Sequence, residues 1–183
     1  EFGEKKLKEI GIPNNSWYVT LHARELGYRG ETKRNTTQNF RTVDIHNYLP
    51  AIKSILDAGG FVFRMGHKTN LKLPKIDGVI DYANSNFKSD VMDVFLGATS
   101  SFSIGTSSGY HIIPKMFNVP ILLADCPSYH GYFYLNEKDL FLPRLFHSEK
   151  DKNFMKFKDV FLPPYKNFNF DEQFKKNRIQ AVH

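Results

Sequence analysis

Short apolar runs alternate with polar segments along the chain, and these runs predict the strands of a buried sheet. Their residues are mostly aromatic or β-branched, which favours strands over helices. The runs cover residues 17–21, 61–65, 78–82, 102–104 and 121–124. The sequence therefore predicts five short strands.

Between the runs, apolar residues take up a helical spacing three times. The three sets are Ile45, Leu49, Ile52 and Leu56; residues 89–96; and Ile112, Ile113, Met116 and Phe117. Pro50 lies inside the first set, so we expect that helix either to be kinked there or to become regular near Leu49. Ser89 is suited to cap the second helix, because Asp90 follows it where the helix dipole favours a carboxylate.

Strands that alternate with helices predict an α/β fold. We expect a Rossmann-like, doubly wound parallel sheet with the strands in the order 3-2-1-4-5. Residues 67–75 are expected to form a loop in place of a full helix, and the polar, basic segment 27–42 a long loop.

The alternation fades beyond Asp125. Residues 139–146 are expected to be extended, and the aromatic stretch 154–174, which prolines interrupt, to pack back over the domain. A last helix is expected within 171–182. The predicted organisation is a charged lead-in without an element (1–16), a Rossmann-like domain (17–146) and an aromatic, basic C-terminal extension (147–183).

Composition adds a charge preference to this picture. The 183 residues, 41% hydrophobic and 24% charged, are typical of one soluble, folded domain. The net charge of +6 indicates an acidic partner, and segment 149–183 carries half of it, with eight Lys and Arg against five Asp and Glu. This extension is either a solvated tail or a surface that touches anionic lipid.

Location and redox state are bounded by what the sequence lacks. No apolar run reaches the roughly 20 residues of a membrane span, and the first residues hold no signal-peptide core. We therefore expect a cytoplasmic protein, at most peripheral to the inner face of the membrane. Cys126 is the single cysteine, which excludes an internal disulfide, and we expect it to be a structural thiol.

The turn after the fourth strand is the first candidate for chemistry. Gly105, Thr106, Ser107, Ser108 and Gly109 combine two glycines, which let backbone approach a ligand, with three hydroxyl donors. The helix expected to follow would add free N–H groups, so the turn suits a phosphate. The alternative is that it only caps the helix.

The end of the first strand is expected to face this turn. In a doubly wound sheet, ligands bind at the carboxyl ends of the strands, where the strand order reverses between strands one and four. Arg24 can grip a diphosphate there, unless it makes a surface salt bridge. His22 either donates to a phosphate or is a structural histidine.

Three further residues end the neighbouring strands. Arg64 is a second candidate for a phosphate or ribose, with an ion pair to Asp81 as the alternative. Asp81 and Tyr82 are candidates for reading a ribose or base by hydrogen bonding and stacking, although such residues more often cap strands.

Missing motifs narrow the reaction class. No Gly-x-Gly-x-x-Gly follows the first strand and no Gly-x-x-x-x-Gly-Lys-Ser/Thr occurs, which argues against dehydrogenases and P-loop NTPases. No Asp-x-Asp occurs either, which argues against an obligatory Mg²⁺ or Mn²⁺ bridge.

Several segments together resemble a family of bacterial glycosyltransferases associated with cell-surface polysaccharide synthesis. The segments are VTLHARE (19–25), GFVFRMG (60–66), VIDYA (79–83), KSDVMDVFL (88–96) and IGTSSG (104–109). The chain is also similar to the C-terminal, nucleotide-sugar-binding half of the GT-B fold. His22-x-Arg24 is similar to the arginine motif with which fucosyltransferases hold a diphosphate.

This resemblance implies an inverting, metal-independent transfer without a cofactor, from a nucleotide-diphosphate sugar to a glycan or lipid-linked glycan acceptor. It places Arg24 on the donor's β-phosphate and leaves Glu25, the adjacent carboxylate, as a candidate catalytic base. A GT-B enzyme has about twice this length, so we expect an N-terminal acceptor half from a longer protein or a partner.

Two other functions stay open. One is a non-catalytic module that binds a nucleotide or an anionic glycan, and the other is a GT-B-like sugar-nucleotide epimerase. Nucleic-acid binding is the weakest alternative, because no recognised motif accompanies the basic, aromatic extension.

Overall fold

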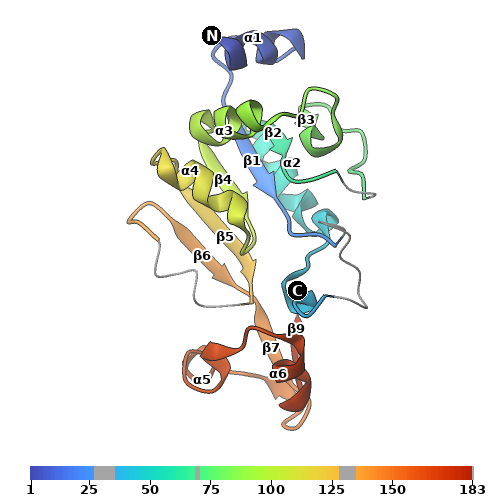
Figure 1. Ribbon diagram of the computed structural model, residues 1–183, viewed down its shortest axis with the longest axis vertical. Helices are drawn as coiled ribbons and strands as arrows, with labels where there is room; N and C mark the ends of the chain where they lie inside the picture. The colour runs from blue at the N-terminus through green and yellow to red at the C-terminus, as the bar shows by residue number, and fades with distance from the viewer. Residues whose placement is uncertain (27–35, 69–70, 128–134, 183) are drawn as a thin grey trace.

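The computed structural model describes residues 1–26, 36–68, 71–127 and 135–182. Its largest unit is a six-stranded parallel sheet in the order β3-β2-β1-β4-β5-β6 (Figure 1). The strands are β1 (Tyr18–His22), β2 (Phe61–Arg64), β3 (Val79–Ile80), β4 (Phe102–Gly105), β5 (Ile121–Cys126) and β6 (Leu140–Pro143). The predicted doubly wound sheet and its order 3-2-1-4-5 are confirmed, and β6 extends the sheet by one strand.

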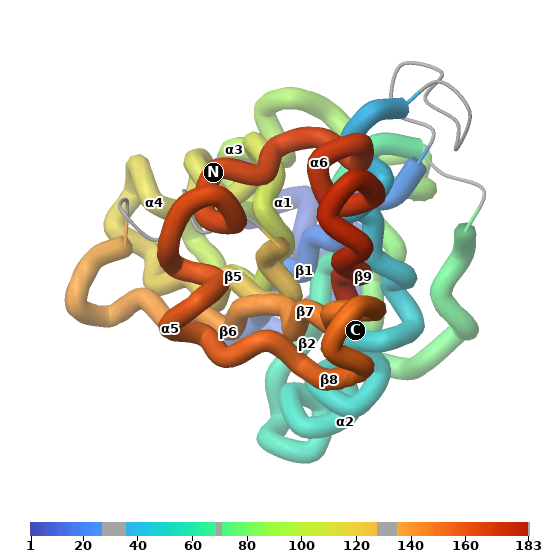
Figure 2. Tube along the Cα trace, turned by 90° about the horizontal axis from the view of Figure 1, so that it is seen from below, coloured from blue at the N-terminus to red at the C-terminus, as the bar shows by residue number. Residues whose placement is uncertain are grey.

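Helices cover both faces of the sheet, as the view in Figure 2 shows. One face carries α2 (Leu49–Asp57), and the other carries α3 (Asp90–Thr99) and α4 (Ile112–Met116). Side chains of β1 alternate between the two cores, since Val19 and Leu21 pack with α2 and Tyr18 packs with α3. In the centre of the sheet, the buried Thr20 hydroxyl donates to Ser103 Oγ at 2.9 Å, so neither hydroxyl is left unsatisfied.

The helix starts follow the capping signals of the sequence. α2 is regular from Leu49, because Pro50 occupies the first turn, where a missing N–H costs nothing. The 3₁₀ helix η3 (Ile45–Tyr48) precedes it. Ser89 caps α3 as predicted, and its hydroxyl accepts from the Met92 amide at 3.3 Å.

The expectation that residues 1–16 hold no element is wrong. Helix α1 (Phe2–Glu9) forms there and lies against α3. Its many charges hide a short apolar side, on which Leu7 packs against the core beneath α3. Gly3 allows this approach, because a Cβ at that position would stand 2.3 Å from the ring of Phe95.

Much of the remaining chain consists of short 3₁₀ turns and irregular segments. Among the residues that the structure describes, the other 3₁₀ helices are η2 (Asn39–Arg41), η4 (Tyr82–Asn84), η5 (Gly109–His111) and η7 (Tyr165–Asn167). The described part of 67–75 holds no helix, as predicted. Most of the predicted long loop at 27–42 lies outside the described residues, which resume at residue 36.

The C-terminal residues form a second, smaller unit with its own core. Its antiparallel sheet has the order β8-β7-β9, and Phe146, Phe168 and Phe174 fill its centre. The elements are β7 (Leu145–Ser148), β8 (Asn153–Phe154), α5 (Phe157–Val160), α6 (Asp171–Lys176) and β9 (Ile179–Val182). The expected extended piece at 139–146 is thus confirmed, whereas the expected helix 171–182 ends at Lys176 and gives way to β9.

The C-terminal unit lies beyond the carboxyl ends of the strands of the parallel sheet (Figure 1). Phe40 and Phe141 from the larger unit pack against its aromatic core. In the part of the chain that the structure describes, no helix has the length and apolar character to cross a bilayer.

Candidate functional site

The ends of β1 and β4 lie side by side at the point where the strand order reverses. His22 pairs with Gly105 in parallel register. Beyond the strands, the Thr106 amide donates to the His22 carbonyl at 3.1 Å, and the Arg24 amide donates to Thr106 Oγ1 at 3.0 Å. Segments about eighty residues apart therefore meet at the edge where doubly wound folds bind ligands.

The two halves of the 105–109 turn have different roles. Thr106 is buried, and its hydroxyl is used to fix the Arg24 backbone. Gly105 is also buried, and its place in β4 is fixed by pairing with His22. Ser107 and Ser108 are half-buried and Gly109 is exposed, so a ligand can reach this second half.

The element after the turn differs from the expected helix. The 3₁₀ helix η5 begins at Gly109, and the α-helix proper starts only at Ile112 and runs for five residues. Ser108 occupies the N-cap position, but its side chain makes no capping hydrogen bond. The capping alternative therefore does not account for the Ser108 hydroxyl, while the short helix offers a weaker dipole than expected.

The turn also fits the pattern Gly-x-Ser-x-Gly, which is typical of the nucleophile elbow of α/β hydrolases. In such an elbow the serine takes a strained backbone conformation and a histidine holds its hydroxyl. Ser107 is not among the residues with positive φ, and the contact recorded for its Oγ is to Arg41, at 3.5 Å. The geometry therefore does not favour a hydrolase.

Arg41 is a site residue that sequence reasoning missed. Its Nη2 donates to the Ser107 carbonyl oxygen, and its Nη1 donates to Gln38 Oε1 at 2.7 Å. Arg41 was visible only as one of several basic residues in a polar segment. Nothing in the local pattern singles it out, because its approach to Ser107 is a tertiary contact.

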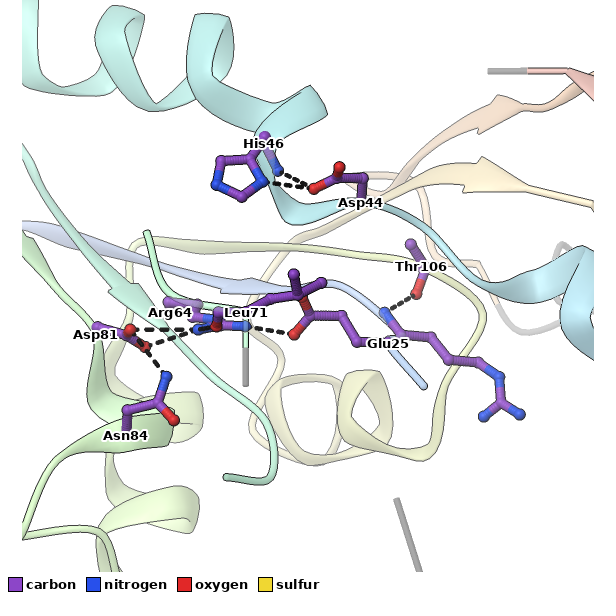
Figure 3. Close-up of polar contacts among 9 residues, drawn as sticks. Glu25, Asp44, His46, Arg64, Leu71, Asp81, Asn84 and Thr106 are labelled. Atoms are coloured by element: carbon purple, nitrogen blue, oxygen red, sulfur yellow. Dashed lines mark hydrogen bonds and ion pairs between the residues drawn. The ribbon is translucent and has the colours of Figure 1, made fainter. Parts of the chain in front are cut away.

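Arg64 forms the centre of a buried ion-pair network (Figure 3). Its side chain is 1% exposed; Nη2 donates to Glu25 Oε2, and Nη1 donates to Asp81 Oδ1 at 3.0 Å and to the Leu71 carbonyl at 2.8 Å. Asn84 Nδ2 donates to the same Asp81 carboxylate at 2.9 Å. Of the two alternatives for Arg64, the structure has the ion pair, so this guanidinium is committed to carboxylates.

Glu25 is tied to Arg64 through only one of its oxygens. The side chain is 9% exposed, and Oε1 is buried without a hydrogen-bond partner in the described part of the chain. Burial raises the pKa of this carboxyl above its ordinary value, although Arg64 acts in the opposite direction. Glu25 therefore takes up a proton more readily than a solvated glutamate.

Tyr82 does not face the crevice, and the expectation that it stacks on a base is wrong. The residue is fully buried in the core beneath α3. Its hydroxyl donates to the Ser89 carbonyl and accepts from the Ser89 amide, both at 3.0 Å. The side chain thus anchors the start of α3, a role that the sequence analysis did not anticipate.

Two histidines border the turn, and both carry lowered pKa values. Burial lowers the pKa of His22 to about 4, with smaller contributions from His111, Arg64 and Arg24. Burial likewise lowers the pKa of His111, with help from Lys115 and Arg41. His22 stacks on Tyr110 with ring centroids 5.4 Å apart, and its Nδ1 is buried without a hydrogen-bond partner in the described chain.

Positive charge adds a smaller contribution to the effect of burial at both histidines. Arg24 and Arg41 approach the turn from two sides, and each disfavours a further proton on a neighbouring histidine. Such a field attracts an anion, and a bound anion would in turn favour protonation of both rings. The arrangement can therefore hold a phosphate-like group and respond to it by taking up protons.

Other chemistries find less support at this edge. Burial raises the pKa of the Cys126 thiol to about 12, as expected for a structural cysteine. Within the described residues no group of three or more His, Cys, Asp or Glu is arranged to hold a metal ion.

Comparison of the chain with protein-family models, curated proteins and solved structures finds no match.

Proposed function

We propose that the chain binds the diphosphate of a nucleotide sugar between the end of β1 and the 105–109 turn, and that it serves as the donor-binding part of a glycosyltransferase. One observation carries this proposal: the backbone amide of Arg24 donates to Thr106 while the Arg41 guanidinium donates to the Ser107 carbonyl, so the end of β1 and a guanidinium meet one turn at the reversal of strand order. The positive charges of Arg24, Arg41 and Lys115, which contribute to the lowered pKa values of the two histidines, support an anionic ligand there.

The proposed transfer makes use of this charge. Cleavage of the bond between sugar and phosphate builds negative charge on the leaving diphosphate. Guanidinium groups held in place before the reaction stabilise that charge more strongly in the transition state than in the ground state. Arg24 and Arg41 are the residues proposed for this role, with the hydroxyls of Ser107 and Ser108 on the remaining phosphate oxygens.

Glu25 is the proposed base that takes a proton from the acceptor hydroxyl of the glycan. Its raised pKa and its unpartnered Oε1 support this role. The acceptor itself would be held by a further domain or partner, in keeping with the resemblance to one half of a GT-B enzyme.

A second candidate function is a binding module without turnover. The ion pair between Glu25 and Arg64 favours it, because a carboxylate held by a buried guanidinium is restrained from reaching an acceptor. Release of free sugar from UDP- or GDP-sugars by the chain would favour the transferase. Binding of these donors with no release of sugar, even with candidate acceptors present, would favour the module.

Calorimetric titration with UDP and GDP tests the proposed site. Arg24→Met should weaken binding of the diphosphate about 10- to 100-fold, since a charged hydrogen bond contributes about 1.5–3 kcal/mol. Arg178→Met is the matched control, because Arg178 is 67% exposed in the C-terminal unit. Equal affinities of the two variants would contradict the proposal.

A further inference from the structure

The backbone around Arg41 is held by the C-terminal unit, although Arg41 itself belongs to the larger one. Asp171, the first residue of α6, accepts from the amides of Asn39 and Phe40, both at 2.8 Å, one on each carboxylate oxygen. The Asp171 amide donates in return to the Thr37 carbonyl at 2.8 Å. One carboxylate thus fixes two successive peptide groups just before Arg41.

Arg144 holds the other side of the same segment. It is 3% exposed, and its Nη1 and Nη2 donate to the carbonyls of Phe40 at 2.5 Å and Thr42 at 3.3 Å. Its Nε donates to Asp125 at 2.7 Å, at an irregularity in the pairing of β5 with β6. The guanidinium therefore joins the segment to the end of β5 beside the turn.

A third contact comes from the aromatic core of the C-terminal unit. The ring of Phe40 lies 4.7 Å from that of Phe174, and its neighbour Arg41 points its guanidinium at Ser107. A carboxylate, a guanidinium and a ring contact thus fix the three residues 39, 40 and 42 around Arg41.

We infer that Asp171 and Arg144 are positioning residues for the diphosphate site, because they hold segment 39–42 where Arg41 reaches the Ser107 turn. The inference rests on the proposed function and deepens it, since it makes the C-terminal unit part of donor binding. Asp171 and Arg144 touch no ligand themselves. They act through Arg41, whose charge and reach fix the second half of the turn.

Hydrogen exchange of the free protein tests the positioning directly. Asp171→Asn keeps the side-chain shape but turns an NH₂ group toward a backbone N–H. We expect exchange at the amides of residues 39 and 40 to become at least about tenfold faster, with a smaller acceleration at the 107–109 turn. Glu172→Gln is the control. Glu172 is the adjacent, exposed carboxylate in the first turn of α6, and it is not one of the residues shown to hold segment 39–42.

Titration with UDP adds a readout that a purely structural role would not move. Asp171→Asn and Arg41→Met should each weaken UDP binding about tenfold. The double variant should bind about as weakly as Arg41→Met alone, because Asp171 acts through Arg41. Thermal unfolding of every variant shows that the fold is retained at the temperature of the titration.

The outcomes separate the positioning role from the proposed function. Unchanged exchange at the turn in Asp171→Asn, or additive losses of affinity in the double variant, would overturn the positioning role. Failure of the wild-type chain to bind UDP and GDP would overturn the proposed function. In that case the hydrogen-exchange comparison of Asp171→Asn with Glu172→Gln still decides whether the hydrogen bonds of Asp171 position the turn.

Discussion

Four arginines lie near the same edge of the parallel sheet, and they fall into two kinds. Arg64 and Arg144 are 1% and 3% exposed, and each is paired with a carboxylate. Arg24 and Arg41 are half-buried and approach the 105–109 turn. The same side chain therefore serves as an internal tie in one region and as a candidate anion ligand in the other.

The difference follows from the cost of burying charge. A guanidinium that loses its water must be matched by carboxylates or carbonyls, and Arg64 meets two carboxylates and a carbonyl. The guanidinium of Arg41, in contrast, keeps part of its surface in water while it donates to Gln38 and to the Ser107 carbonyl. Position relative to the core, and not proximity to the crevice alone, separates the arginines proposed for binding from the structural ones.

The largest expected effect is a loss of stability when the buried, ion-paired Arg64 is replaced. Arg64→Met removes the ion-pair partner of the buried Glu25 and leaves Asp81 with the Asn84 amide, so the free energy of unfolding should fall by about 3–5 kcal/mol. Arg178→Met removes an exposed guanidinium 3.8 Å from Glu149 and should cost less than about 0.5 kcal/mol. Urea unfolding monitored by circular dichroism measures both. If the free energy of unfolding falls as little in Arg64→Met as in the control, the ion pairs of Arg64 do not stabilise the fold.

The next largest effect is the pH dependence of folding stability that His22 causes. The pKa of His22 is about 4 in the folded state, below its ordinary value of 6.5, so its contribution to stability is complete above pH 6.5 and is lost as pH falls toward 4. The loss amounts to about 3 kcal/mol. The raised pKa of Glu25 opposes it in the same range, so the contribution is read from the difference between wild type and His22→Asn.

Unfolding measured from pH 7 to pH 4 gives that difference. The wild type should lose more stability toward acid than His22→Asn, which carries no titrating group at position 22. Parallel curves for the two proteins would contradict a His22 that is neutral in the folded state.

Sequence patterns predicted the sheet because its signals are local. Each apolar run is a strand, and the reversal between β1 and β4 follows from the winding of such folds, so Arg24 and the turn could be brought together in advance. Helix α1 was missed because the charges of Phe2–Glu9 mask its apolar side. The antiparallel C-terminal sheet was missed because β9 pairs with β7 across about thirty residues, although β8 follows β7 closely.

The candidate site was predicted less completely than the fold. Arg41 was not singled out because the grip of Asp171 and Arg144 depends on the C-terminal unit. Tyr82 was misplaced because a strand end indicates the edge of the sheet but not the direction of the side chain. For Arg64 the sequence left open a ligand contact or an ion pair with Asp81. Burial of the side chain decides between them, and a four-residue strand does not reveal it.

The smallest effect separates Tyr82 from the site. Tyr82→Phe removes the hydroxyl that bonds Ser89 at 3.0 Å, which should lower the free energy of unfolding by about 1–2 kcal/mol. Binding of UDP should stay within about twofold of the wild type, since Tyr82 is fully buried. A stable variant with a large loss of UDP affinity would return Tyr82 to the binding residues.

A crystal structure of the chain with UDP or GDP tests the location of the diphosphate most directly. We predict phosphate oxygens within hydrogen-bond distance of the Arg24 guanidinium and of the Ser107 or Ser108 side chain. Nucleotide bound elsewhere, for example in the groove of the C-terminal unit beside Phe154 and Lys156, with the 105–109 turn empty, would contradict it.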